Sequence, residues 1–529
     1  MKMKRKMAAA LSAVVAVSAF SMIPAFAADL MNPPVVEVEQ GQLRGVMDGD
    51  VYSFLGVPYA YVPERFALPQ DPESWEGIRN AQAFGPICPI PDQTSVGDDE
   101  LVWPHRYWIQ NENCQVLNIW SKDINPETKK PVLVYIHGGG YNNGSSIEGV
   151  AHDGRNLTEY GDVVTVSINH RLNVLGYLDL SSYGGEFENA CNLGDADMVQ
   201  ALKWVYENID SFGGDPENIT IMGQSGGGRK VQSMLHYEEN AGIVKQAVVQ
   251  SSSALSLLDK ETASLVAEQT LENLGLDENT ISEIKTVDYK DLITAAVEAQ
   301  NTVGEELGTS VKWQPVENEG VISETYCDWA SDVPMIVGSV LTEQTSSFRV
   351  GDGRKNEWTE EEVLANLTEK YGDKAQDIAD AFAEAYPDKK VADAFFYGAS
   401  HRENVKKVAL EKTESGTAPV YTFMFTYETP VNGGVTAFHC NDIIYFLHNV
   451  EIPIITTATG GEGNLDALAL QDTMANALLS FMKTGNPSTE ELPWEAFTAE
   501  TPNSMRFDIE SKCSIIADEK LNELCLSQN

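Results

Sequence analysis

The sequence predicts an α/β fold in which a mixed, mostly parallel central sheet is flanked by helices. Short apolar, β-branched segments alternate with helical segments through the first half of the chain, which is typical of parallel sheets. One buried-type strand, at 131–136, ends in a glycine-rich turn, where open α/β sheets place their chemistry. Another, at 219–222, runs into a serine between glycines and then into a helix.

The expected elements follow one another in a regular order. Residues 35–57 alternate in short segments typical of a small antiparallel meander. A helix over 198–209 has apolar residues at helical spacing, and a second helix begins near 231. A helix at 474–482 ends where Gly and then Pro follow its last turn. The strands are expected at 116–120, 131–136, 163–168, 219–222, 247–250, 334–340, 420–426 and 505–509.

The first residues predict an exported protein. Basic residues at 2–6 precede an apolar run over 7–23, and Ala25-Phe26-Ala27 forms an A-x-A cleavage site, as in a secretory signal peptide over 1–27. The run is shorter than the ~20 residues of a membrane span. We therefore expect a secreted, extracellular chain of residues 28–529, away from the membrane after cleavage. It should form one α/β domain with helical insertions at about 258–310 and 358–410, which form a lid or gorge wall.

Composition excludes several function classes. The chain of 529 residues carries a formal net charge of −43, which repels nucleic acid and anionic membranes. Its hydrophobic content of 43 % argues against disorder. Seven cysteines leave at least one unpaired in a monomer, and no C-x-x-C or His-rich cluster indicates a metal. We expect neither a metal nor a cofactor, and the sequence leaves the oligomeric state open.

Two glycine-rich segments carry the chemistry. Gly223-Gln224-Ser225-Gly226-Gly227 is a G-x-S-x-G in the strand–turn–helix context of a nucleophile elbow. Glycines are needed there because the turn brings strand and helix backbones close together. His137-Gly138-Gly139-Gly140 follows the strand at 131–136 and has the form of an oxyanion loop. The pair predicts a serine hydrolase.

Further along, the chain resembles the type B carboxylesterase and cholinesterase family of α/β-hydrolases. The resemblance extends in order over nearly all of residues 28–529. It implies an α/β-hydrolase fold, a small-molecule ester substrate and an acyl-enzyme mechanism. The segments that carry it are FLGVPYA, ENC-x-x-LNIW, HGGGY, NHRLNVLGY, N-x-G-x-x-D, FGGDP, GQSGGG and KTGNP.

The resemblance assigns the catalytic residues by position. Ser225 is the nucleophile, Glu343, five residues after Gly338, is the acid, and His439 in His-Cys-Asn-Asp is the base. His448 is the other candidate for the base. The amide groups of Gly139, Gly140 and Gly226 would form the oxyanion hole.

Other assignments also rest on the resemblance. Cys88 and Cys114 are expected to form a disulfide, whereas the pairing of the other five cysteines, at 191, 327, 440, 513 and 525, stays open. Arg65–Glu112 and Arg171–Asp197 are expected to be structural ion pairs. The chain departs from the family at Gly226, where alanine is usual, and at Cys440, where glycine is usual. Arg229 and Lys230 oppose the helix dipole, and we expect their side chains to leave the site.

The ester itself is not fixed by the sequence. Trp103 lies near the position of the choline-binding tryptophan of cholinesterases, and a tryptophan face binds quaternary ammonium. Gln224 stands where cholinesterases carry a glutamate, which argues against choline. A general carboxylic ester hydrolase is the main expectation. A choline-ester hydrolase, a hydrolase of amides or lactones, and a non-catalytic cholinesterase-like binding protein are the alternatives.

Overall fold

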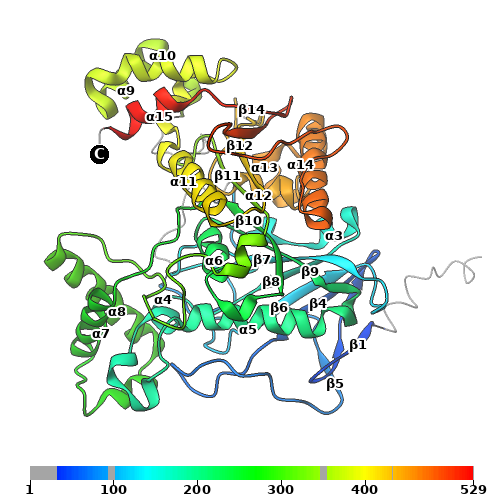
Figure 1. Cartoon of the computed structure of the whole chain (residues 1–529), viewed down its shortest axis with the longest axis vertical. Helices are drawn as coiled ribbons and strands as arrows, with labels where there is room; N and C mark the ends of the chain where they lie inside the picture. Colours follow the sequence, from blue (N-terminus) through cyan, green and yellow to red (C-terminus); the bar gives the residue numbers. More distant parts are fainter. Residues whose placement is uncertain (1–32, 93–99, 101, 346–353, 432, 528–529) are drawn as a thin grey trace, which may run out of the picture.

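An eleven-stranded sheet forms the centre of the molecule. The computed structural model describes residues 33–92, 100, 102–345, 354–431 and 433–527, so the expected signal peptide lies outside the described residues. The strand order is β14-β13-β12-β11-β10-β9-β7-β8-β6-β4-β3, and a separate three-stranded sheet has the order β1-β2-β5. Figure 1 shows the helices on both sides of the large sheet.

The sheet is mixed, with a parallel centre and antiparallel ends. All pairs from β13 through β12, β11, β10, β9 and β7 to β8 are parallel. The pairs β13–β14, β3–β4, β4–β6 and β6–β8 are antiparallel. The predicted fold class is therefore confirmed. The strands are β1 Val35–Val38, β2 Gly41–Arg44, β3 Val46–Asp48, β4 Val51–Pro58, β5 Ile78–Asn80, β6 Val116–Ser121, β7 Lys130–Ile136, β8 Val164–Ile168, β9 Gly214–Gln224, β10 Val244–Gln250, β11 Met335–Val340, β12 Val420–Phe425, β13 Asn503–Phe507 and β14 Lys512–Ile515.

The central strands are buried on both faces. Their side chains alternate between two apolar cores: in β7, Leu133 and Tyr135 enter one core, while Val134 and Ile136 enter the other. This double burial explains why these strands read as continuous apolar runs. Because these strands run parallel, the carboxyl ends of β7, β9 and β11 lie along one edge of the sheet.

Helices cover both faces. α5 begins at Leu193, earlier than the expected 198, and α14 begins at Leu465 rather than 474. The Asn464 side chain accepts a hydrogen bond from the Ala467 amide, and this cap extends α14 by more than two turns. The helices are α3 Arg155–Gly161, α4 Asn173–Tyr177, α5 Leu193–Asn208, α6 Gly226–Met234, α7 Lys260–Asn273, α8 Tyr289–Leu307, α9 Glu360–Tyr371, α10 Ala375–Ala385, α11 Ala399–Ser415, α12 Asn441–Phe446, α13 Thr456–Thr459, α14 Leu465–Thr484 and α15 Glu519–Leu526.

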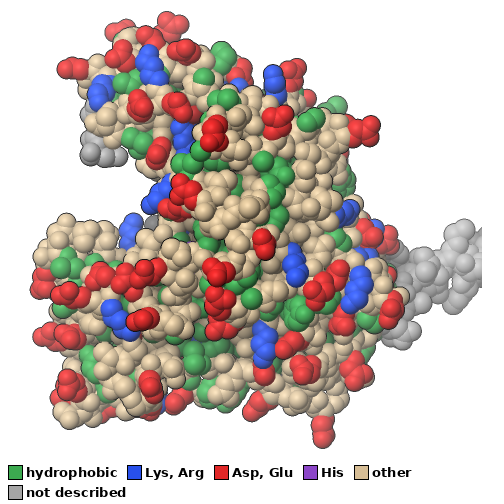
Figure 2. Space-filling model, in the orientation of Figure 1, with side chains coloured by type: hydrophobic (Ala, Val, Ile, Leu, Met, Phe, Trp, Pro, Cys, Tyr) green, Lys and Arg blue, Asp and Glu red, His purple; other side chains and the backbone are tan. Residues whose placement is uncertain are grey.

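The two expected insertions are helical. α7 packs on α8, and α8 contacts α4 (Figure 1). α9 packs on α10, and α10 contacts α15, whereas α11 lies directly against β11 and β12. Figure 2 shows the surface hollowed between the α7–α8 pair and the α9–α10 pair, with acidic side chains scattered over both. That these helices act as a lid stays a prediction.

The Cys88–Cys114 disulfide is not formed in the structure, which corrects that expectation. All seven cysteines are free thiols. Cys88 and Cys114 are both buried and share a hydrogen bond. Burial and then this contact raise the pKa of Cys114 well above its ordinary value. The Cys88 sulfur also accepts a hydrogen bond of 3.2 Å from the Leu172 amide, so each thiol is satisfied without a covalent bond.

The two expected ion pairs are present. Arg171 Nη2 lies 2.7 Å from Asp197 Oδ1, and both side chains are buried. Arg65 binds Glu112 through two nitrogens and donates further hydrogen bonds to backbone carbonyls at 284 and 287.

Among the described residues, no helix is both long enough and apolar enough to cross a membrane.

Candidate active site

Ser225 occupies a strained turn between a strand and a helix. β9 ends at Gln224 and α6 begins at Gly226, so the serine between them has φ 59° and ψ −123°. Few residues other than glycine adopt such a positive φ, and strain of this kind clusters at functional sites. The Ser225 amide donates to the Gln250 carbonyl at 2.8 Å, which anchors the turn to β10.

The turn also requires glycines because two backbones meet there. A Cβ atom on Gly227 would lie 2.2 Å from the Ile136 carbonyl oxygen at the end of β7. A Cβ atom on Gly226 would lie 2.4 Å from the N, Cα and O atoms of Gly140. Gly226 stands where the family usually has alanine, and the absent side chain lets the loop at 137–140 approach α6 more closely than alanine would allow.

His439 and Glu343 are joined by a hydrogen bond. His439 Nδ1 lies 2.5 Å from Glu343 Oε2, and the other carboxylate oxygen accepts a bond of 3.2 Å from the Val340 amide. Glu343 follows the end of β11 and its side chain is fully buried, whereas that of His439 is 30 % exposed. Burial alone would raise the pKa of Glu343, but His401 and His439 hold it below its ordinary value. The carboxylate is therefore ionised at neutral pH and can stabilise an imidazolium.

Ser225, His439 and Glu343 line one cavity of about 240 Å³. Gly139 and Gln224 line it as well. The Gln224 amide nitrogen is 3.2 Å from Nε2 and 3.3 Å from Nδ1 of His439, so it lies against the ring rather than in line with one nitrogen. Cys440 fixes this amide, because its thiol donates to Gln224 Oε1 at 3.2 Å.

The three amides expected to form the oxyanion hole belong to the loop at 137–140 and to the start of α6. Gly139 and Gly140 have φ of 83° and 65°. In the part of the chain that the structure describes, the amides of Gly139, Gly140 and Gly226 donate no backbone hydrogen bond. Such amides can bind a developing negative charge beside Ser225.

The Lys230 side chain binds the backbone of this loop, which corrects the expectation that it leaves the site. The side chain is fully buried in α6. Its Nζ donates to the carbonyl oxygens of His137 at 3.1 Å and Gly138 at 3.4 Å. The Gly138 carbonyl and the Gly139 amide belong to one peptide unit, so a cation on the carbonyl polarises the amide. Burial lowers the pKa of Lys230 to about 7.

His137 has a structural environment. It is buried and stacks on His170 with ring centroids 4.7 Å apart. Burial, then the charge of Lys230, lowers its pKa well below the ordinary value, so the ring is neutral. His448, the other candidate for the base, instead pairs with Asp472 at 2.8 Å and stacks on Tyr160, and it lines a different cavity.

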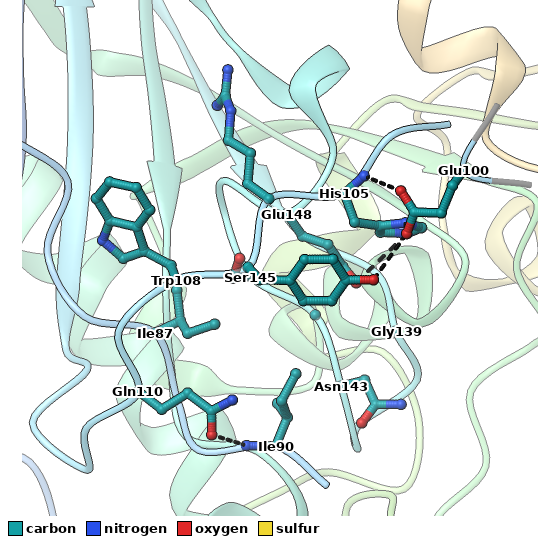
Figure 3. Close-up of a pocket in the computed structure, with 13 residues that line it drawn as sticks. Ile87, Ile90, Glu100, His105, Trp108, Gln110, Gly139, Asn143, Ser145 and Glu148 are labelled. Carbon is teal, nitrogen blue, oxygen red and sulfur yellow. Dashed lines mark hydrogen bonds and ion pairs between the residues drawn. The ribbon is translucent and has the colours of Figure 1, made fainter. Parts of the chain in front are cut away.

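A second cavity of about 440 Å³ adjoins the first and shares Gly139, His105 and Glu148 with it (Figure 3). Trp108 and Ile87 stand on one side in this view, and Ile90 and Gln110 lie below. Glu100 binds His105 Nδ1 at 2.7 Å near the junction of the two cavities. The lining combines apolar and aromatic surface with a few polar groups, as in small-molecule sites.

The Trp103 ring is covered by neighbouring residues and does not form an open binding site for a cation. It lines the Ser225 cavity, but only 8 % of its surface is exposed. Its ring packs edge-on against His152, with centroids 5.6 Å apart, and covers Gly149, where a Cβ atom would lie 2.7 Å from Trp103 Cζ2. Little of the indole face is therefore left for a ligand.

One neighbour of the site, His401, has no recognisable signal in the sequence. His401, in the first turn of α11, lies with its ring centroid 5.8 Å from that of His439. It lies far from Glu343 and His439 along the chain and belongs to none of the recognised segments, so only the packing of α11 against β11 reveals it.

Comparisons with known proteins agree over nearly the whole chain. The Carboxylesterase family model matches residues 32–524. The para-nitrobenzyl esterase of Bacillus subtilis (strain 168) is 30 % identical over 493 residues, covering 91 % of this chain and 96 % of that protein. Neuroligin-3 of Mus musculus is 37 % identical, but over only 42 % of this chain and 31 % of the neuroligin.

One solved structure is similar to this chain in fold over nearly the whole length of both chains. It is an esterase from the anaerobe Clostridium hathewayi that hydrolyses aliphatic aromatic polyesters, with a TM-score of 0.84 and 34 % sequence identity over 94 % of this chain and 98 % of that one. The fold, the family match and these esterases agree, and we conclude that the chain belongs to the carboxylesterase family and is a carboxylic ester hydrolase.

Proposed function

We propose that the protein is a secreted serine esterase that works through an acyl-enzyme, with Ser225 as the nucleophile. A serine hydroxyl is a weak nucleophile unless a base takes its proton. His439 accepts that proton and then returns it to the leaving alcohol. The observation that carries the proposal is the 2.5 Å hydrogen bond between His439 and the buried Glu343, in the same cavity as the strained Ser225.

Glu343 has two tasks in this mechanism. Its hydrogen bond to Nδ1 fixes the tautomer in which Nε2 carries no proton and can accept one from Ser225. Its negative charge then stabilises the imidazolium that forms. The Val340 amide holds the carboxylate in place, so the acid, which lies in the turn after β11, is tied to the last residue of that strand.

The oxyanion of the tetrahedral intermediate binds the amides of Gly139, Gly140 and Gly226. One donor of this kind contributes about 3–4 kcal/mol to catalysis in other hydrolases. The contact between Gly226 and Gly140 brings donors from the loop and from α6 together. Lys230 holds the loop and strengthens the Gly139 donor through the shared peptide unit.

The adjoining cavity supports esters that carry an aromatic or apolar group. Aromatic rings bind through area burial and edge contacts with Trp108 and its neighbours. The names of the para-nitrobenzyl esterase and the polyester-cleaving esterase point the same way. Because the face of Trp103 is covered, a choline ester is a less favoured substrate in this proposal than an aryl ester.

A fluorophosphonate probe tests the proposed nucleophile. The probe should label the wild-type protein at the peptide that contains Ser225, and it should leave Ser225→Ala unlabelled. Folded wild-type protein that does not react would favour a non-catalytic binding protein. Export is tested separately: N-terminal sequencing of the protein recovered from the medium should begin at Ala28.

A further inference from the structure

Three metal-binding side chains converge beside the cavity that holds Ser225. Glu343, His401 and His439 each offer a ligand atom, and these atoms all lie within 4.8 Å of one another. The three residues are far apart in the sequence, which is why spacing alone indicated no metal site. They come from the turn after β11, the first turn of α11 and the segment before α12.

The packing of α11 fixes this arrangement. The Gly398 amide donates to the Leu341 carbonyl at 3.0 Å, which joins the start of α11 to the end of β11. A Cβ atom on Gly398 would lie 2.7 Å from Glu343 Cγ, so only glycine lets the helix approach this closely. His401 follows within one turn and is therefore held near Glu343.

The donor set selects the kind of ion. Two imidazoles and one carboxylate form a three-ligand zinc set that leaves a position open for water or inhibitor. Ca²⁺ and Mg²⁺ prefer oxygen ligands, whereas imidazole suits Zn²⁺ and Cu²⁺. Donors around a tetrahedral Zn²⁺ stand roughly 3.4 Å apart. The ligand atoms lie up to 4.8 Å apart, and the imidazoles of His401 and His439 are only partly buried, so binding of Zn²⁺ requires these rings to reorient about the buried Glu343 carboxylate and to give up the hydrogen bond between His439 and Glu343.

We propose that Glu343, His401 and His439 form an inhibitory site for a divalent transition-metal ion, for which Zn²⁺ is the natural probe. A bound ion occupies a ring nitrogen of His439 and an oxygen of Glu343. The imidazole can then no longer exchange protons with Ser225 and the leaving alcohol, so hydrolysis stops until the ion leaves. The loss of activity rests on the proposed function, whereas binding of the ion does not.

His401 distinguishes this site from adventitious binding to an acidic protein. It offers a metal ligand but exchanges no proton in the proposed hydrolysis, and without it Glu343 keeps its hydrogen bonds to His439 and to the Val340 amide. His401→Gln should therefore keep most of the metal-free esterase activity, and inhibition is compared with each variant's own metal-free rate. His448→Gln is the matched control, because it removes another imidazole beside a carboxylate, Asp472, at a different cavity. Circular dichroism melts confirm that both variants are folded.

Two measurements together test the proposal. Isothermal titration of Zn²⁺ into Ser225→Ala, with and without His401→Gln, reports binding independently of activity. Hydrolysis of p-nitrophenyl butyrate against Zn²⁺, with Mg²⁺ as the control ion and EDTA to reverse, reports inhibition. We expect one tight site, reversible inhibition in the wild type and in His448→Gln, and at least about tenfold weaker binding and inhibition when His401 is replaced.

The outcomes separate the two claims. Equal binding and equal inhibition with and without His401 would overturn the metal site. Binding of Zn²⁺ that depends on His401, together with folded wild-type protein that has no esterase activity, would support the metal site while contradicting the proposed function. Inhibition that persists after His401→Gln, or that Mg²⁺ reproduces, would assign the effect to unspecific cation binding and overturn the proposal.

Discussion

Gly226 and Gly140 touch through their backbones: a Cβ atom on Gly226 would lie 2.4 Å from the N, Cα and O atoms of Gly140. Alanine, the usual residue of the family at this position, does not fit the loop as it stands here. The contact joins α6 to the loop at 137–140, so the two segments that are proposed to bind the oxyanion meet next to Ser225. Catalysis should therefore depend on this glycine.

Gly226→Ala should lower kcat by at least about tenfold, because the clash pushes Gly140 away from the oxyanion. KM should change less, since the adjoining cavity is untouched. Steady-state hydrolysis of p-nitrophenyl butyrate measures both. Gly463→Ala is the control, because a Cβ atom there meets nothing within 4 Å. A Gly226→Ala enzyme as active as the wild type would show that the loop can move aside freely.

Lys230→Met should lower kcat by about tenfold with little change in KM, because the loop loses its two hydrogen bonds to Nζ. The ratio of wild-type to variant kcat should be largest below pH 7, where Lys230 is charged, and should narrow above it. A pH profile of kcat for both proteins measures this. A ratio that is constant with pH would assign Lys230 a purely structural role.

The same substitution should stabilise the fold most at low pH. Burial holds the pKa of Lys230 at about 7, whereas an exposed lysine titrates near ~10.4. Between pH 7 and ~10.4 the Lys230 side chain is protonated in the unfolded chain but not in the folded one. The free-energy cost of burying the charged lysine is therefore full below pH 7 and falls as pH rises. The gain from methionine should be about 2 to 3 kcal/mol larger at pH 6 than at pH 9. Thermal melts of both proteins at the two pH values test this, and an equal gain at both would contradict it.

Asp197→Ala should lower the free energy of unfolding by about 3–5 kcal/mol, because it leaves the buried Arg171 charge without its partner. Asp71→Ala breaks the exposed ion pair with Lys203 and should cost no more than about 1 kcal/mol. Denaturant melts of the three proteins measure the difference. Melts of Asp197→Ala that match those of the wild type would mean that the ion pair adds nothing to stability.

Trp108→Ala should raise KM for p-nitrophenyl benzoate by about threefold to tenfold relative to p-nitrophenyl acetate, because an aromatic contact contributes about 0.5–1.5 kcal/mol beyond its buried area. Trp108 lines the adjoining cavity and not the one that holds Ser225, so kcat should change little. Equal effects on both esters would place the aromatic group elsewhere.

The sequence predicted the sheet and the catalytic segments well, because each rests on a local pattern. The strand at 131–136 is an apolar run that matches β7 almost residue for residue. Helix ends were less predictable, as in α14, where the cap at Asn464 adds residues before the expected start. The elbow at Ser225 was recognisable because its glycines stand at fixed spacing.

Features that depend on distant segments could not be predicted. Lys230 looked like a cation at the wrong end of a helix, and only the carbonyls of His137 and Gly138 explain its burial. His401 approaches His439 because α11 packs on β11, and no spacing in the sequence records that contact. The sequence shows glycine at 226, where the family usually has alanine, but the structural effect of this difference depends on the position of Gly140.

Hydrolysis of p-nitrophenyl butyrate by the purified residues 28–529, compared with Ser225→Ala, tests the central claim most directly. The wild type should turn over the ester with a burst of p-nitrophenol that reports the acyl-enzyme. Ser225→Ala should lose at least about 10³-fold in kcat while keeping the melting temperature of the wild type. Comparable turnover by the folded variant would contradict the assignment of Ser225 as the nucleophile.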